Sequence, residues 1–131
     1  MNALPREASG SLTGRVALVT GSATGIGRET VLALASAGAN VVVNYSRSDA
    51  DAKKTHQEAE ALGASAILCQ ADVADEASVQ AMIHQTTEVF GRLDILINNA
   101  GTTQFVPLTQ LDDLTDDLWD HIFDVNVKGA F

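Results

Sequence analysis

One stretch constrains the fold more than any other: an apolar run that leads directly into closely spaced glycines. Residues 16–19 read Val-Ala-Leu-Val, and glycines follow at positions 21, 25 and 27. An uncharged run rich in valine is typical of a strand buried on both faces of a parallel sheet. Glycines permit a sharp turn, and the unpaired N–H groups at the start of the next helix bind anions. The stretch therefore predicts a strand, a turn and a helix that together bind the pyrophosphate of a dinucleotide.

The rest of the chain alternates apolar segments with helical patterns. Strands are predicted at 16–20, 41–43, 64–70 and 93–97, and helices at 25–37, 49–62, 76–90 and from about 115. Gly38, Gly63 and Gly91 follow three of these helices, where a left-handed residue commonly ends a helix. Asp75 is the predicted cap of the third helix. This alternation predicts an α/β protein with a Rossmann-type, doubly wound parallel sheet, truncated after the fourth strand and part of the following helix.

Length and composition favour one soluble domain. Residues 1–12 have no periodicity and are expected to be a flexible leader, whereas residues 13–131 form a dinucleotide-binding domain. No apolar run approaches the roughly 18 residues that a membrane helix requires. Cys69 is the single cysteine, which fits a reducing compartment, and we expect a cytoplasmic protein with no membrane partner. The net charge of −9 argues against a nucleic-acid partner.

The sequence predicts no metal site. His56, His84 and His121 are far apart and lie in no zinc-binding arrangement. Aspartates crowd residues 112–124, but their spacing lacks the glycine and glutamate of a calcium loop. Carboxylates at the start of a helix are also favoured by its dipole, so a solvated acidic face is the better interpretation.

Four motifs in order resemble the short-chain dehydrogenase/reductase family, in its ordinary rather than extended branch. They are Thr20-Gly21-Ser22-Ala23-Thr24-Gly25-Ile26-Gly27, Asp72-Val73, Asn98-Asn99-Ala100-Gly101, and Asn126 in the last helix. The resemblance extends from about Leu12 to Phe131. Each motif alone fits a turn, a helix cap or a solvent-facing residue equally well, and only their joint occurrence indicates the family.

The resemblance implies roles for particular residues. Those expected around the pyrophosphate and the adenosine phosphate are Gly21, Ser22, Thr24, Gly25, Ile26 and Gly27. Asp72 would accept a hydrogen bond from the adenine amino group, with the backbone of Val73 beside it. Asn98, Ala100 and Gly101 would pass under the adenine ribose and hold the central strand, and the first strand would lie beside the fourth.

The end of the second strand meets the adenosine ribose, where an acidic residue favours NAD. This chain has Asn44 there, followed by Tyr45, Ser46 and Arg47, with no carboxylate among residues 44–48. An arginine and neighbouring hydroxyls suit a 2′-phosphate, so we predict NADP, with NAD less favoured. Two points weigh against this: Arg47 alone also fits a solvated loop, and NADP-preferring members often carry a basic residue at the position of Thr24.

The family's chemistry requires a serine on the fifth strand and a Tyr-x-x-x-Lys pair on the helix that follows. Tyr45 is the single tyrosine and has Asp49 four residues later, so no such pair occurs in these 131 residues. Asn126 is the catalytic residue that this chain would supply, because the family's asparagine positions the lysine through an ordered water and completes a proton relay. We expect the other catalytic residues to lie in a segment absent from this chain.

The resemblance implies an NADP-dependent oxidoreductase that interconverts a small-molecule carbonyl and an alcohol by hydride transfer. It is greatest to members that reduce 3-oxoacyl thioesters or oxidise sugars. The alternatives are a non-catalytic dinucleotide-binding module, a fragment that needs a second chain, and an interaction piece that docks through Trp119 on the last helix. The fourth strand would leave an uncovered apolar edge, so we expect poor solubility or a homo-oligomer.

Overall fold

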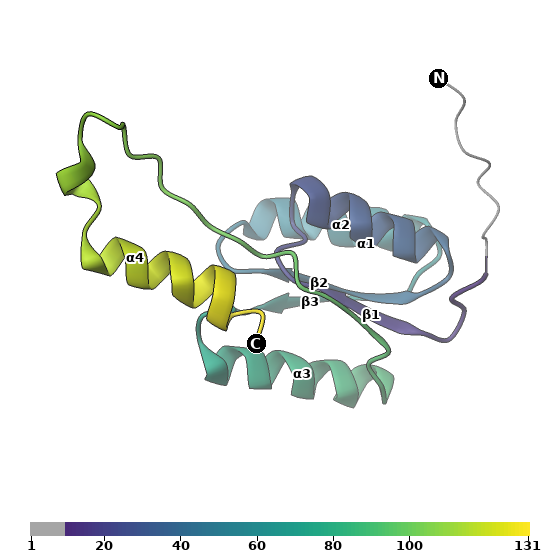
Figure 1. Cartoon of the computed structure of the whole chain (residues 1–131). Coiled ribbons are helices and arrows are strands. Elements are labelled where there is room, and N and C mark those ends of the chain that lie inside the picture. Colours follow the sequence, from purple (N-terminus) through teal and green to yellow (C-terminus); the bar gives the residue numbers. More distant parts are fainter. Residues whose placement is uncertain (1–9) are drawn as a thin grey trace, which may run out of the picture.

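A parallel four-stranded sheet forms the centre of the computed structural model, which describes residues 10–131 (Figure 1). The strands are β1 (Val16–Val19), β2 (Asn40–Tyr45), β3 (Ala66–Gln70) and β4 (Ile95–Ile97). Their order is β3-β2-β1-β4, and every neighbouring pair is parallel. The predicted α/β class and the position of the first strand beside the fourth are confirmed. Several predicted boundaries were wrong: β2 extends from Asn40 through Tyr45, β3 begins at Ala66, β4 begins only at Ile95, and β1 ends one residue early at Val19.

Helices lie where the sequence predicts them, and the first three connect the strands. They are α1 (Gly25–Ser36), α2 (Asp49–Ala61), α3 (Glu76–Phe90) and α4 (Asp116–Phe123), with a short 3-10 turn, η1 (Leu111–Asp113), before α4. The last helix continues as a π-helical turn, η2 (Asp124–Lys128). Gly38, Gly63 and Gly91 all have positive φ angles, which confirms that they end helices. The carboxylate of Asp75 accepts from the Ser78 amide and caps α3 as predicted.

The central strands β1 and β2 are buried on both faces, which explains the uninterrupted apolar run in β1. Leu18 and Val42 pack with Met82 of α3 on one face, whereas Val19 packs with Val31 of α1 on the other. Figure 1 shows α1 and α2 on one side of the sheet and α3 on the opposite side.

The predicted leader, residues 1–12, lies mostly outside the described residues. Its last residue, Leu12, packs against the core, and its amide donates to the carbonyl of Ala37 at 2.9 Å. The ordered domain therefore includes Leu12.

The edge strand β4 is thinly covered. Leu96 is 49% exposed, and the chain after β4 runs away from the sheet, so that α4 lies clear of it (Figure 1). An open apolar edge supports self-association, which stays a prediction. None of the helices within residues 10–131 has the length and apolarity needed to cross a bilayer.

Asp94 joins the amino ends of β1 and β4. Its carboxylate accepts from the Arg92 guanidinium at 2.6 and 2.8 Å, from the Val16 amide at 2.9 Å and from Arg15 at 3.2 Å. These donors, Arg92 foremost, hold the pKa of Asp94 well below its usual range. Because the folded pKa is depressed, this stabilisation is complete above about pH 4 and is lost as the pH falls further.

We therefore expect Asp94→Asn to lower the free energy of unfolding at pH 7 and to flatten its fall between about pH 4 and pH 2. Urea denaturation at pH 7 and at several values between about pH 4 and pH 2 measures both effects. Asp113→Asn is the control, since this exposed carboxylate has no ion pair within residues 10–131. If the free energy of unfolding of Asp94→Asn fell as steeply between about pH 4 and pH 2 as that of the unmodified chain, the expectation would be contradicted.

Candidate functional site

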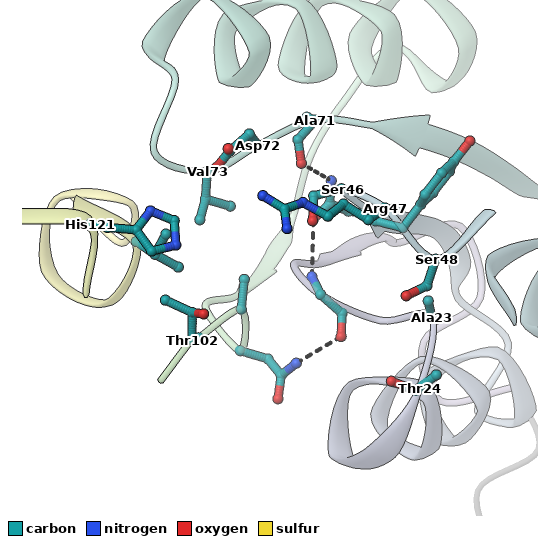
Figure 2. Close-up of a pocket in the computed structure, with 17 residues that line it drawn as sticks. Ala23, Thr24, Ser46, Arg47, Ser48, Ala71, Asp72, Val73, Thr102 and His121 are labelled. Carbon is teal, nitrogen blue, oxygen red and sulfur yellow. Dashed lines mark hydrogen bonds between the residues drawn. The ribbon is translucent and has the colours of Figure 1, made fainter. Parts of the chain in front are cut away.

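A cavity of about 350 Å³ opens where the carboxyl ends of the strands meet. Its walls come from the segments that follow all four strands, with further side chains from α4 and η2. Parallel strands end at a common edge of the sheet, and ligands bind there in folds of this class. The lining residues that Figure 2 labels are Ala23, Thr24, Ser46, Arg47, Ser48, Ala71, Asp72, Val73, Thr102 and His121.

The glycine turn after β1 needs its glycines for two physical reasons. Gly21 and Gly25 have φ angles of 61° and 60°, a region that other residues rarely adopt. A Cβ on Gly21 would also lie 2.9 Å from the Cα of Ala100. The turn therefore approaches the segment after β4 closely, and the predicted role of these glycines in chain reversal is confirmed.

The amino end of α1 has unpaired donors. Thr24 makes no side-chain capping bond, and the first helical amide with a partner is that of Arg28, which donates to the Thr24 carbonyl. Within residues 10–131, the amides of Gly25, Ile26 and Gly27 find no acceptor. A helix start without a cap and with free N–H groups is an anion site.

Two amides earlier in the turn are occupied by the protein itself. The Gly21 amide donates to Oδ1 of Asn44 at 3.0 Å, and the Ser22 amide donates to the Asn44 carbonyl at 2.9 Å. Thr55 of α2 holds the same turn by donating to the Ala23 carbonyl at 2.9 Å. The amides of Gly21 and Ser22 are therefore engaged in shaping the turn.

Thr20 and Asn99 join the turn after β1 to the segment after β4. The Thr20 hydroxyl accepts from the amides of Asn99 and Ala100, both at 3.0 Å. The Asn99 side chain donates to the carbonyls of Thr20 and Gly21 at 2.9 and 3.0 Å. Sequence reasoning assigned the neighbouring Asn98 to the site, but Asn99 and not Asn98 lines the cavity. The repeated asparagine was the signal, and only the strand geometry shows which of the two faces inward.

Asp72 and Val73 follow β3 and line the cavity, as their motif predicts. Oδ1 of Asp72 accepts from the Ala74 amide at 2.9 Å, so this carboxylate also stabilises its own turn. Both interpretations of Asp72, as a turn residue and as a site residue, agree with this position.

The segment after β2 presents one cation to the cavity. Arg47 lines it and forms no ion pair within the described chain, and its guanidinium extends toward Val73 and His121 (Figure 2). The Tyr45 hydroxyl donates to Asp49 at 2.9 Å, and this hydrogen bond raises the pKa of Tyr45. Ser46 lines the cavity while its carbonyl accepts from Gln70. Arg47 is therefore the positive group here, and the Tyr45 hydroxyl is committed to α2.

Asn126 lies in the π-helical turn η2 and not in a regular helix. Its side chain forms a reciprocal pair with the backbone of Thr102, with both hydrogen bonds at 2.8 Å. This pair fixes the segment after β4 against η2, beside Gly101. Ala71, Thr102, His121 and Val125 also line the cavity and were missed by sequence reasoning, because no motif marks them.

Two other chemistries find no support among residues 10–131. No group of three histidine, cysteine or acidic side chains is arranged to hold a metal ion. Cys69 is buried, and burial raises the pKa of its thiol to about 11, which keeps it protonated.

Comparison with known proteins agrees with this geometry. The sequence model of the family described as short chain dehydrogenase matches residues 15–131. The chain is 47% identical over 120 residues to versicolorin reductase 1 of Dothistroma septosporum, covering 92% of this chain and 44% of that protein. It is 44% identical over 121 residues to the 3-oxoacyl-[acyl-carrier-protein] reductase of Synechocystis, covering 92% of this chain and 48% of that protein.

Among solved structures, a short chain dehydrogenase from Burkholderia cenocepacia in complex with NADP superposes with a TM-score of 0.84 at 43% identity. The match covers 90% of this chain and 47% of that one. The chain thus spans about half the length of the proteins it matches.

Proposed function

The chain belongs to the short-chain dehydrogenase family, and from this premise we propose that it binds NADP for an oxidoreductase that interconverts a carbonyl and an alcohol. One observation carries the proposal. Thr24, which precedes the uncapped start of α1, and the unpaired guanidinium of Arg47 border the same cavity at the carboxyl edge of the sheet, and the unpaired amides of α1 follow Thr24 directly in the chain. Two separate anion sites suit a ligand with a pyrophosphate and a further phosphate.

The residues present fit such a dinucleotide. A side chain on Gly21 would clash with the Cα of Ala100, so the glycine lets these two segments, which both line the cavity, approach each other. The segment of residues 44–48 brings no carboxylate that would repel a 2′-phosphate. The related dehydrogenase of Burkholderia cenocepacia was solved with NADP, which supports this choice over NAD.

We assign the parts of the nucleotide as follows. The amides of Gly25, Ile26 and Gly27, with Thr24 at the helix start, hold the pyrophosphate. Arg47 and Ser46 hold the 2′-phosphate. Asp72 and Val73 meet the adenine, with Ala100 and Gly101 beside the ribose.

When bound, the nicotinamide of this cofactor supplies or accepts a hydride. The chain's own residues bind and orient the adenosine half, because the cavity is built from the ends of β1 to β4. The Asn126 side chain is hydrogen-bonded to the backbone of Thr102. Asn126 would therefore take part in a proton relay through its main-chain groups. The Tyr-x-x-x-Lys pair that would complete proton transfer does not occur in these 131 residues.

The second candidate is a non-catalytic dinucleotide-binding module. The two functions differ in turnover: a module binds NADPH without oxidising it in the presence of ketones. Both depend on the same cavity, so nucleotide binding is the first property to test.

We expect NADPH to bind more tightly than NADH, and Arg47→Ala to remove most of this difference. A hydrogen bond to a charged group contributes about 1.5–3 kcal/mol, which corresponds to a loss of about 10- to 100-fold in NADPH affinity. Fluorescence titration of the 131-residue chain with each nucleotide measures the effect. Lys54→Ala is the matched control, because it removes one exposed positive charge from α2 outside the cavity.

NADH affinity should change little in Arg47→Ala. Tighter binding of NADH than of NADPH by the unmodified chain would overturn the choice of cofactor. Binding of neither nucleotide would overturn the proposed function itself.

A further inference from the structure

Asn44 is buried in the last part of β2, with only 1% of its surface exposed. Its side-chain amide nevertheless has a partner for each of its polar groups. Oδ1 accepts from the Gly21 amide at 3.0 Å, and Nδ2 donates to the carbonyls of Cys69 and Ala71 at 3.1 and 3.2 Å. One donor group facing two carbonyls and one acceptor facing an amide define the orientation of this side chain without ambiguity.

The backbone of Asn44 makes a second set of contacts to the same turn. Its amide donates to the Ser22 hydroxyl at 3.0 Å, and its carbonyl accepts from the Ser22 amide at 2.9 Å. A single residue therefore joins the turn after β1 to the end of β3 through β2. Figure 2 shows the hydrogen bond to the Ala71 carbonyl as a dashed line.

We propose that Asn44 is a positioning residue: its buried amide fixes the Gly21–Ser22 turn so that the start of α1, at Thr24, borders the nucleotide cavity. This deepens the nucleotide-binding function proposed above and rests on it. In this role Asn44 does not recognise the 2′ substituent of the adenosine ribose, although its position at the end of β2 would suggest that it does. That task falls to Ser46 and Arg47, which line the cavity with groups not bound to the turn.

The proposal distinguishes asparagine from aspartate in a way that ribose recognition does not. Asparagine offers an acceptor to Gly21 and donors to two carbonyl oxygens, whereas an aspartate carboxylate offers acceptors only. A carboxylate at this position would face the carbonyls of Cys69 and Ala71 in a buried site, which disfavours it. If Asn44 positions the turn, both Asn44→Asp and Asn44→Ala disturb it. The effect on binding is then the same whether the ribose carries a 2′-hydroxyl or a 2′-phosphate.

The first measurement is nucleotide affinity in Asn44→Ala and Asn44→Asp, with NADP, NAD and adenosine 2′-monophosphate as probes. We expect both variants to bind NADP and NAD about tenfold more weakly, as loss of one well-placed hydrogen-bonded contact predicts. The ratio of the two affinities should not change. Adenosine 2′-monophosphate lacks the pyrophosphate, so both variants should bind it as tightly as the unmodified chain does. A general loss of folded protein would instead weaken the binding of all three probes.

The control is Thr86→Val, which removes a buried hydroxyl on α3 that donates to the Met82 carbonyl, away from the cavity. It should leave all three affinities unchanged. A shift of the NADP-to-NAD ratio toward NAD in Asn44→Asp, with NAD affinity retained, would overturn the proposal and make Asn44 the ribose-reading residue. Unchanged affinities in both Asn44 variants would overturn it as well.

The second measurement needs no nucleotide: hydrogen exchange of the Gly21 amide by NMR. In Asn44→Ala this amide loses its acceptor, so its protection should fall at least tenfold while that of Val42 in the middle of β2 is retained. Should Asn44→Ala fail to fold, Asn44→Ser removes the same acceptor geometry with a polar residue in its place. Unchanged protection of Gly21 would overturn the positioning role, whereas failure of the unmodified chain to bind nucleotide would overturn only the proposed function.

Discussion

Gly27→Ala should abolish most nucleotide binding, although alanine is the better helix former. Gly27 lies in the first turn of α1, where its replacement by alanine would ordinarily stabilise a helix by about 1 kcal/mol. In this structure the same substitution is expected to be destabilising. A Cβ on Gly27 would overlap the Gly21 carbonyl oxygen and would lie 2.9 Å from the Cα of Ser22, and neither backbone atom can rotate away.

The cost of inserting a methyl group into a packed site is about 1–3 kcal/mol, and relief comes from moving α1 away from the turn. That movement displaces the free amides at the start of α1, so we expect NADPH affinity to fall by about 100-fold, or roughly 2.7 kcal/mol. Fluorescence titration measures the affinity, and urea denaturation measures the stability.

Gly63→Ala is the matched control for this change. Gly63 follows α2 with φ 92° and has nothing within 4 Å of an added Cβ. It should lower the free energy of unfolding by about 1 kcal/mol through backbone strain and leave nucleotide binding intact. NADPH affinity in Gly27→Ala equal to that in Gly63→Ala would show that the α1 contact does not shape the site.

Thr20→Val should destabilise the chain by about 2–4 kcal/mol, since it leaves two amides without an acceptor. Thr20 is 4% exposed, and its hydroxyl is the acceptor for the amides of Asn99 and Ala100. Valine has nearly the same shape, so the effect is one of hydrogen bonding and not of volume. Urea denaturation gives the free energy of unfolding, and nucleotide titration reports whether the segment after β4 has moved.

Thr87→Val provides the comparison, because this exposed threonine of α3 donates only to carbonyls of its own helix. It should change the free energy of unfolding by no more than about 0.5 kcal/mol. A loss in Thr20→Val as small as that in Thr87→Val would mean that water replaces the hydroxyl, and that the link between β1 and β4 is not held by Thr20.

Much of the fold follows from local sequence. The apolar run of β1 and the glycines at 38, 63 and 91 act through the conformations of neighbouring residues, so they predict the strand and three helix ends. Strand boundaries were less accurate, as β2 shows: Asn44 and Tyr45 look like loop residues in sequence but pair with Cys69 and Gln70 of β3. Pairing with a strand more than twenty residues away is invisible to local periodicity.

The sequence by itself determined that this chain forms a parallel sheet in which a glycine turn leads into a helix, because those features depend on backbone freedom and on residues adjacent in the chain. Only the tertiary structure decided which donors of that turn are free. Gly21 finds its acceptor in Asn44, 23 residues later, and its carbonyl is held by Asn99, 78 residues later. Hydrogen bonds are satisfied in space and not along the chain, so the division between groups that shape the site and groups that can bind a ligand appears only once the strands are in register.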